Sequence, residues 1–251
     1  MNKTTIILLT ACVKPNGMSF TALQDMEVRQ NQYEEALLFY LKNTDLNILF
    51  VENTNTNFSE KFIDYIDNKR LQYITFNGND YDKELGKGYG EALIIQEAVN
   101  TDFYKNADFI IKISGRTILR NIDDLIKQDK QLKNYNSIIG DYNLKSNCIE
   151  SRIFFVPTRF LVNYFLNNSQ KINDTAGIYF EHILMECVLK WIMDDNHFYV
   201  FNFPLFYDGF SGSTGQKLTM PSSWLKLKIY CKASLVNKLH LLKHIILKRN
   251  N

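Results

Sequence analysis

The sequence has few of the residues that report disulfides, metal clusters or membrane spans. Four cysteines occur among 251 residues, and none lies in a Cys-x-x-Cys pair or beside a histidine at zinc-ligand spacing. This pattern argues against a disulfide framework and indicates free thiols in a reducing compartment. No apolar stretch is long enough to cross a bilayer, and the apolar run near the N-terminus is too short for a signal peptide. We therefore expect a cytoplasmic protein.

Acidic residues are missing from the C-terminal segment 217–251. This segment holds eight Lys and Arg and no Asp or Glu, so residues 1–216 carry about six net negative charges. Leucine, isoleucine and one tryptophan interleave with the lysines, which is typical of an interfacial helix on an anionic membrane. A helix packed on the body with a solvated basic rim is the alternative. We expect a body of residues 1–216 and a basic amphipathic helical segment of residues 217–251.

Apolar runs alternate with helical patterns along the first half of the chain. The runs at 4–11, 47–51, 71–76 and 108–113 predict buried strands. Helical patterns follow near 33–41, 59–68, 91–99 and 122–132, and this alternation predicts an α/β fold with parallel strands. Later strands are predicted near 137–141, 152–157 and 199–203, with helices at 158–166 and 179–193. The whole pattern predicts a Rossmann-like mixed sheet flanked by helices.

Ligands of parallel α/β sheets bind beyond the carboxyl ends of the strands. The residues at those ends combine carboxylates, small residues and cations, a mixture that suits a nucleoside carrying a diphosphate. The predicted donor-site residues are Thr10, Ala11, Cys12, Glu52, Asn53, Lys87, Gly88, Lys112, Ser114, Gly115 and Arg116.

Over residues 4–208 the layout resembles the GT-A class of nucleotide-sugar glycosyltransferases, especially small bacterial enzymes of capsule and lipopolysaccharide assembly. Residues 48–53 are similar to the second strand of that fold, whose terminal acid contacts the nucleoside. Residues 86–92 lie where the family has a glycine-containing turn into a helix, and residues 107–116 where it has the strand that ends in a metal-binding Asp-x-Asp. The resemblance implies a GT-A-like catalytic domain over residues 1–216, a nucleotide-sugar donor, and a glycan or lipid-linked acceptor.

The chain departs from the family at the expected metal site. Asp108 begins the strand, but no acid stands at its end. An Asp-x-Asp pair holds a divalent ion that neutralises the departing nucleoside diphosphate. Lys112 and Arg116 can supply that charge directly, so we expect no metal and no other cofactor. The alternative is that Lys112 snorkels at the strand end and Arg116 pairs with Asp123 or Asp124.

An inverting transferase needs a base on the acceptor hydroxyl. The candidate is Glu181, in the region where the resembled family carries an acid at a helix start. The alternative is an acid that only stabilises the helix dipole. Glu150 and Asp141 are second choices for the base. The predicted acceptor contacts are Tyr179, Phe180, His182 and Asp141.

Two further pairs share a helix face at i, i+4 spacing, namely Arg29 with Tyr33 and His240 with His244. We expect Arg29 to be a surface cation rather than a support for the nucleotide loop. We expect the two histidines to lie on a basic face rather than to bind zinc.

The leading hypothesis is therefore a glycosyltransferase acting on a lipid-linked, lipopolysaccharide or capsule glycan at the inner face of the plasma membrane, with inversion and without a metal. A nucleotidyltransferase acting on sugar phosphates shares the nucleotide cleft and is one alternative. A nucleic-acid-binding protein that uses the basic segment is another, but the acidic body argues against it.

Overall fold

The structure is a computed structural model of the 251-residue chain. It describes residues 3–18, 21–132, 135–143, 146, 148–210, 215–218, 230, 231 and 234. The predicted amphipathic helix of residues 217–251, with His240 and His244, lies almost entirely outside the described residues. Within the part of the chain that the structure describes, no helix is both long enough and apolar enough to cross a membrane.

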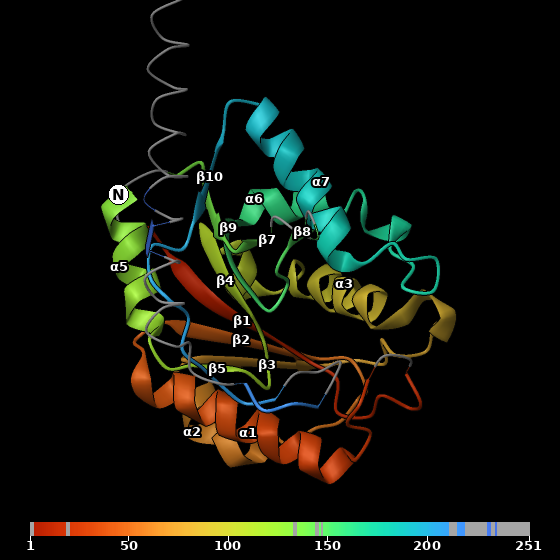
Figure 1. The fold of residues 1–251 in the computed structure, drawn as a ribbon. Coiled ribbons are helices and arrows are strands. Elements are labelled where there is room, and N and C mark those ends of the chain that lie inside the picture. Colours follow the sequence, from red (N-terminus) through yellow and green to blue (C-terminus); the bar gives the residue numbers. More distant parts are fainter. Residues whose placement is uncertain are drawn as a thin grey trace, which may run out of the picture.

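A seven-stranded sheet forms the centre of the molecule (Figure 1), in the order β10-β6-β9-β4-β1-β2-β3. Strand β9 runs antiparallel to both of its neighbours, and the other strands are mutually parallel. The predicted mixed sheet is therefore confirmed. The strands are β1 (Thr5–Ala11), β2 (Asn47–Glu52), β3 (Leu71–Thr75), β4 (Phe109–Ser114), β6 (Ser137–Gly140), β9 (Ile153–Pro157) and β10 (His197–Val200).

Two pairs of short strands lie outside this sheet. β5 (Ile118–Leu119) pairs with β11 (Tyr207–Asp208), and β7 (Tyr142–Asn143) pairs with β8 (Cys148–Ile149).

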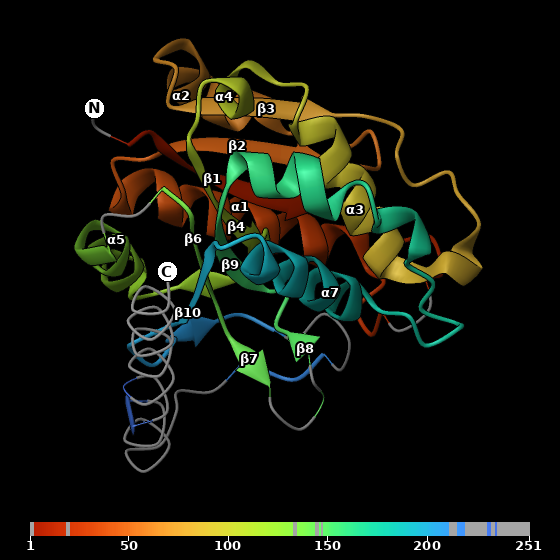
Figure 2. The same cartoon turned by 90° about the horizontal axis from the view of Figure 1, so that it is seen from above.

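Helices cover both faces of the sheet and give three layers (Figures 1 and 2). The first face carries α1 (Met26–Asn43), a 3₁₀ turn at Ser59–Phe62, α2 (Ile63–Asp67) and α5 (Ile122–Leu132). The second carries α3 (Gly86–Ala98), α4 (Asp102–Lys105), α6 (Thr158–Phe160) with a π-helical turn at Leu161–Phe165, and α7 (Phe180–Met193). Short 3₁₀ turns at Lys83–Leu85 and Ser169–Lys171 precede α3 and α7.

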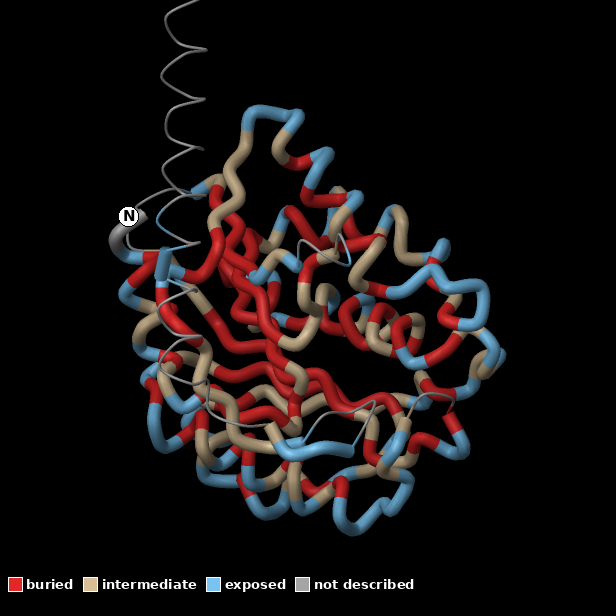
Figure 3. The backbone as a smooth tube through the Cα atoms, in the orientation of Figure 1, coloured by how far each residue is buried: buried red, intermediate tan, exposed pale blue. Residues whose placement is uncertain are grey.

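Side-chain alternation along the central strands builds two separate cores. In β1, Ile6 and Leu8 pack toward α3 and α7, whereas Ile7 and Leu9 pack toward α1 and α5. Because both faces are covered, the strand reads as a continuous apolar run rather than an alternating one. The buried backbone in Figure 3 is concentrated in these central strands.

Two local predictions were wrong. Helix α3 begins at Gly86, so the three spaced glycines form its first turns rather than a loop that precedes it. The helix predicted near 59–68 is shorter than expected, because Ser59–Phe62 forms a 3₁₀ turn and α2 begins at Ile63.

Candidate functional site

A cleft of about 220 Å³ opens beyond the carboxyl ends of β1, β2 and β4, between α3 and α7. It brings together nine of the eleven predicted donor-site residues and three of the predicted acceptor-side residues. The lining donor-site residues are Thr10, Ala11, Cys12, Asn53, Lys87, Gly88, Ser114, Gly115 and Arg116, and the acceptor-side residues are Tyr179, Phe180 and Glu181. The four others, Glu52, Lys112, His182 and Asp141, are not among the described residues that line it.

The loop after β1 is fixed by α1. The guanidinium of Arg29 donates to the carbonyl of Cys12 at 2.9 and 2.5 Å and to that of Leu23 at 3.1 Å. The Cys12 N–H donates to the hydroxyl of Tyr33 at 2.9 Å. Arg29 is only 4% exposed, so the expectation of a surface cation was wrong. Its charge is buried because three backbone contacts replace its hydration, and it supports the cleft wall.

Arg116 is the cation that the end of β4 presents to the cleft. Its Nη1 donates to Gln32 Oε1 at 2.8 Å, and its guanidinium lies 5.9 Å from the ring centre of Tyr33. Burial lowers the pKa of Arg116 from its usual value. Gly115 permits this turn, since a Cβ there would lie 2.8 Å from the Thr10 carbonyl oxygen. Among the described residues Arg116 forms no ion pair with Asp123 or Asp124, and Asp124 pairs with Lys127 instead.

Glu52 serves the loops at the cleft edge rather than the cleft itself. It is fully buried, and its carboxylate accepts from the N–H groups of Val13 at 3.0 Å, Thr54 at 2.9 Å and Thr56 at 2.8 Å. The next residue, Asn53, does line the cleft, and its Oδ1 is buried without a hydrogen-bond donor. Glu52 therefore does not present its carboxylate to the cleft, and Asn53 is the residue after β2 that lines it.

Lys112 lies beneath the cleft floor and not in the cleft. Its side chain is fully buried, forms an ion pair with Glu91 on α3, and donates to the carbonyl of Ser151 at 2.6 Å. The rings of Phe154 and Phe180 lie 5.5 and 5.7 Å from its ammonium. Neither direct contact with a diphosphate nor snorkelling to solvent fits this position, because alternation in β4 turns residue 112 toward α3.

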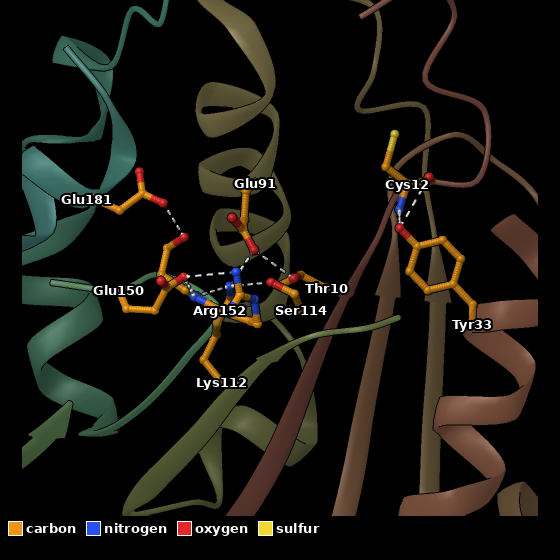
Figure 4. Close-up of polar contacts among 10 residues, drawn as sticks. Thr10, Cys12, Tyr33, Glu91, Lys112, Ser114, Glu150, Arg152 and Glu181 are labelled. Carbon is orange, nitrogen blue, oxygen red and sulfur yellow. Dashed lines mark hydrogen bonds and ion pairs between the residues drawn. The ribbon is translucent and has the colours of Figure 1, made fainter. Parts of the chain in front are cut away.

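Polar contacts continue from Lys112 across the cleft floor (Figure 4). Thr10 Oγ1 donates to Glu91 Oε1 at 2.9 Å, the same oxygen that pairs with Lys112. Ser151, whose carbonyl holds Lys112, donates its hydroxyl to Glu181 Oε1 at 2.5 Å. One network therefore joins the end of β1 to the candidate base. The sequence hypothesis missed Glu91, whose signal was an acid one residue after the spaced glycines.

The sequence hypothesis also missed Asp174, whose carboxylate packs against the glycines of α3. Its Oδ2 accepts from the Gly88 N–H at 3.2 Å, and Oδ1 is buried without a donor. Gly86 has φ +81°, and a Cβ at Gly86 would overlap the Asp174 side chain. Burial raises the pKa of Asp174. The spaced glycines thus admit a carboxylate to the N-terminus of α3, where the helix dipole favours negative charge.

The acceptor-side residues divide around the start of α7. Glu181 lies in the first turn of α7 and lines the cleft, as do Tyr179, which is 42% exposed, and Phe180. His182 is not among the described residues that line the cleft, and its Nδ1 accepts from the Tyr179 N–H at 3.4 Å at the start of α7. Asp141 lies on the surface, and its backbone carbonyl accepts from the Glu150 N–H at 2.9 Å.

Charge is divided along the cleft. Arg29 and Arg116 line one end beside Cys12, with Lys83 and the buried carboxylate of Glu52 also close to that thiol, whose pKa burial raises to about 11. Carboxylates predominate at the other end, which Glu91, Asp174, Glu150 and Glu181 line, with Lys87 and Arg152 among them. An anionic group is favoured at the first end, and a neutral group that donates hydrogen bonds is favoured at the second.

The end of β4 does not fit a divalent metal ion. Ser114, Gly115 and Arg116 offer one hydroxyl and a cation where hard cations take carboxylate oxygens. Within the described residues, no group of three or more His, Cys, Asp or Glu side chains is placed to hold a metal ion.

No protein-family model and no curated protein matches the chain. Solved structures share its general layout at 8–12% identity. The glycosyltransferase GlyE of Streptococcus pneumoniae aligns over 78% of this chain and 45% of its own, with TM-score 0.46 and 10% identity. S. aureus TarS in complex with UDP-GlcNAc aligns over 64% and 47%, with TM-score 0.39 and 8% identity. The chain thus spans about half the length of these two proteins.

A cytidylyltransferase from Leptospira borgpetersenii aligns over 78% of this chain and 75% of its own, with TM-score 0.44 and 12% identity. Likenesses at this level of identity assign no activity to the chain.

Proposed function

We propose that the protein is a glycosyltransferase that moves a sugar from a nucleoside diphosphate to a glycan acceptor. The observation that carries the proposal is the charge-divided cleft at the carboxyl ends of β1, β2 and β4. A nucleotide sugar has the same division, with an anionic diphosphate at one end and a neutral, hydroxyl-rich ring at the other.

The donor nucleotide occupies the end formed by β1, β2 and the turn after β4. The buried Oδ1 of Asn53 lacks a hydrogen-bond donor, and a nucleoside N–H or O–H supplies one. The Arg116 guanidinium is held by Gln32 and Tyr33, and its remaining N–H groups form a fork for a phosphate. Developing negative charge on the leaving diphosphate is stabilised by this preorganised cation.

Glu181 acts as the base at the opposite end. Ser151 fixes one of its oxygens at 2.5 Å, and α7 places the carboxylate on the cleft wall. It takes the proton from the acceptor hydroxyl as that oxygen attacks the anomeric carbon and the nucleoside diphosphate departs. Attack from the face opposite the leaving group inverts the anomeric configuration.

The acceptor is a lipid-linked, lipopolysaccharide or capsule glycan at the inner face of the plasma membrane. The composition of residues 217–251, with eight cations and no acid among apolar residues, supports a peripheral site on an anionic membrane.

A transfer assay with a panel of nucleotide sugars, run with and without EDTA, tests the function. We expect one donor to lose its sugar to an acceptor or to water with no loss of rate in EDTA. Failure of every nucleoside diphosphate to bind would overturn the proposal. Pyrophosphate release from a nucleoside triphosphate and a sugar phosphate, abolished by EDTA, would show a nucleotidyltransferase instead.

A further inference from the structure

Glu91 is the carboxylate that α3 presents to the cleft. One oxygen, Oε1, is committed, because it accepts from Thr10 at 2.9 Å and pairs with Lys112. The side chain is 21% exposed. The second oxygen points away from both partners in Figure 4, and no described residue donates to it. Glu91 thus offers the cleft a single open acceptor.

Lys112 holds this carboxylate in place. A fully buried ammonium needs a nearby anion, so Glu91 cannot turn away without leaving the charge of Lys112 unpaired. Ser151 accepts from Lys112 through its carbonyl at 2.6 Å and donates to Glu181 through its hydroxyl at 2.5 Å. The open oxygen of Glu91 and the carboxylate of Glu181 are therefore fixed relative to each other.

The surroundings of the open oxygen determine which group can approach it. Glu150, Glu181 and Asp174 line the same end of the cleft together with Lys87 and Arg152, and Arg152 pairs with Glu150, so the carboxylates outnumber the cations and a phosphate is disfavoured there. An ionised carboxylate accepts hydrogen bonds and donates none, so its ligand must carry an O–H or N–H. A sugar ring that projects from a diphosphate held near Arg116 supplies such a group.

We infer that Glu91 binds one hydroxyl of the transferred sugar and selects donors that carry it, with Lys112 as its positioning residue. The inference rests on the proposed function, and it adds a selectivity site that is separate from the base and from the diphosphate cation.

Glu91→Gln tests the contact, because glutamine keeps the shape but turns an N–H₂ or a weaker carbonyl toward the sugar. Glu97→Gln is the matched control on the same helix, outside the cleft lining. The wild type and both variants are compared with the best donor and with its monodeoxy and deoxyfluoro analogues at each ring position. We expect E91Q to lower kcat/KM for the full donor by about 10- to 100-fold. The analogue that lacks the hydroxyl bound by Glu91 should react with wild type and E91Q at nearly equal rates. E97Q should behave as wild type with every donor.

Binding of the nucleoside diphosphate without its sugar separates the inference from the proposed function. If E91Q binds this ligand as wild type does and loses only the sugar-dependent rate, the inference stands. Equal loss of affinity for the diphosphate and the nucleotide sugar would overturn it, as would an unchanged selectivity profile. If the wild type binds no nucleoside diphosphate, the proposed function fails, and the inference fails with it.

Lys112→Met tests the positioning role while keeping the apolar stem. A merely structural role lowers the rate with every donor equally. Positioning of Glu91 instead predicts that K112M loses the same single-hydroxyl selectivity as E91Q, and that E91Q/K112M loses no more. Retained selectivity in folded K112M would contradict the role assigned to Lys112.

Discussion

Replacing Lys112 by methionine tests how the buried charge under the cleft contributes to stability. The change removes the ion pair with Glu91 and the hydrogen bond to the Ser151 carbonyl, but keeps the apolar stem beside the rings of Phe154 and Phe180. Removing one partner of a buried pair costs about 3–5 kcal/mol. Glu91 is 21% exposed, so the freed carboxylate can reach solvent, and we expect a loss near 3 kcal/mol.

Urea unfolding followed by circular dichroism measures this loss. With a slope of about 2–3 kcal/mol/M, the midpoint should fall by about 1 M. Lys61→Met is the control, because Lys61 is 58% exposed and pairs with Glu34 at the surface, where a pair contributes less than about 1 kcal/mol. Glu91→Leu combined with K112M should recover part of the loss, since it leaves no unpaired charge. Equal midpoints for K112M and K61M would refute the reasoning.

Three further outcomes are expected. Asp174→Asn should raise the melting temperature at pH 8, because burial raises the pKa of Asp174 and the ionised form therefore destabilises the fold. That gain should shrink as the pH falls toward 4, where the native carboxyl also takes up a proton, and a pH-independent difference would contradict it. Iodoacetamide at pH 8 should modify the exposed Cys231 before Cys12, whose thiol has a pKa of about 11, as peptide mass spectrometry can show. Arg29→Met should lower both stability and donor affinity, since it releases the loop after β1, and loss of neither would contradict that role.

The elements that sequence patterns predicted well are those with a single strong signal. The apolar runs of β1, β2 and β4 predicted buried strands because both of their faces are covered. Nine of the eleven predicted donor-site residues then line the cleft, since parallel strands share one carboxyl edge.

Sequence patterns did not predict the environments of Lys112 and Arg29, because the groups that contact them are distant in the sequence. A lysine near a strand end suggests a phosphate ligand. The structure shows instead that Glu91, on α3, neutralises Lys112. Arg29 shares a helix face with Tyr33, but the carbonyl of Cys12 that accepts its N–H groups comes from a different loop.

The spaced glycines were expected only as a turn into a helix, because the side chain that packs against them, Asp174, lies 86 positions from Gly88. Glycine is needed at Gly86 because the Asp174 side chain approaches the backbone closely there. The sequence pattern does not show which side chain approaches.

The central claim is that the cleft binds a nucleotide sugar through Arg116. A thermal-shift panel of nucleoside diphosphates and nucleotide sugars in EDTA, run on wild type and on Arg116→Ala, tests it most directly. We predict that one nucleotide sugar raises the melting temperature of wild type but not of R116A, whose own unliganded transition stays cooperative. No shift with any nucleotide, or the same shift in R116A, would contradict the account.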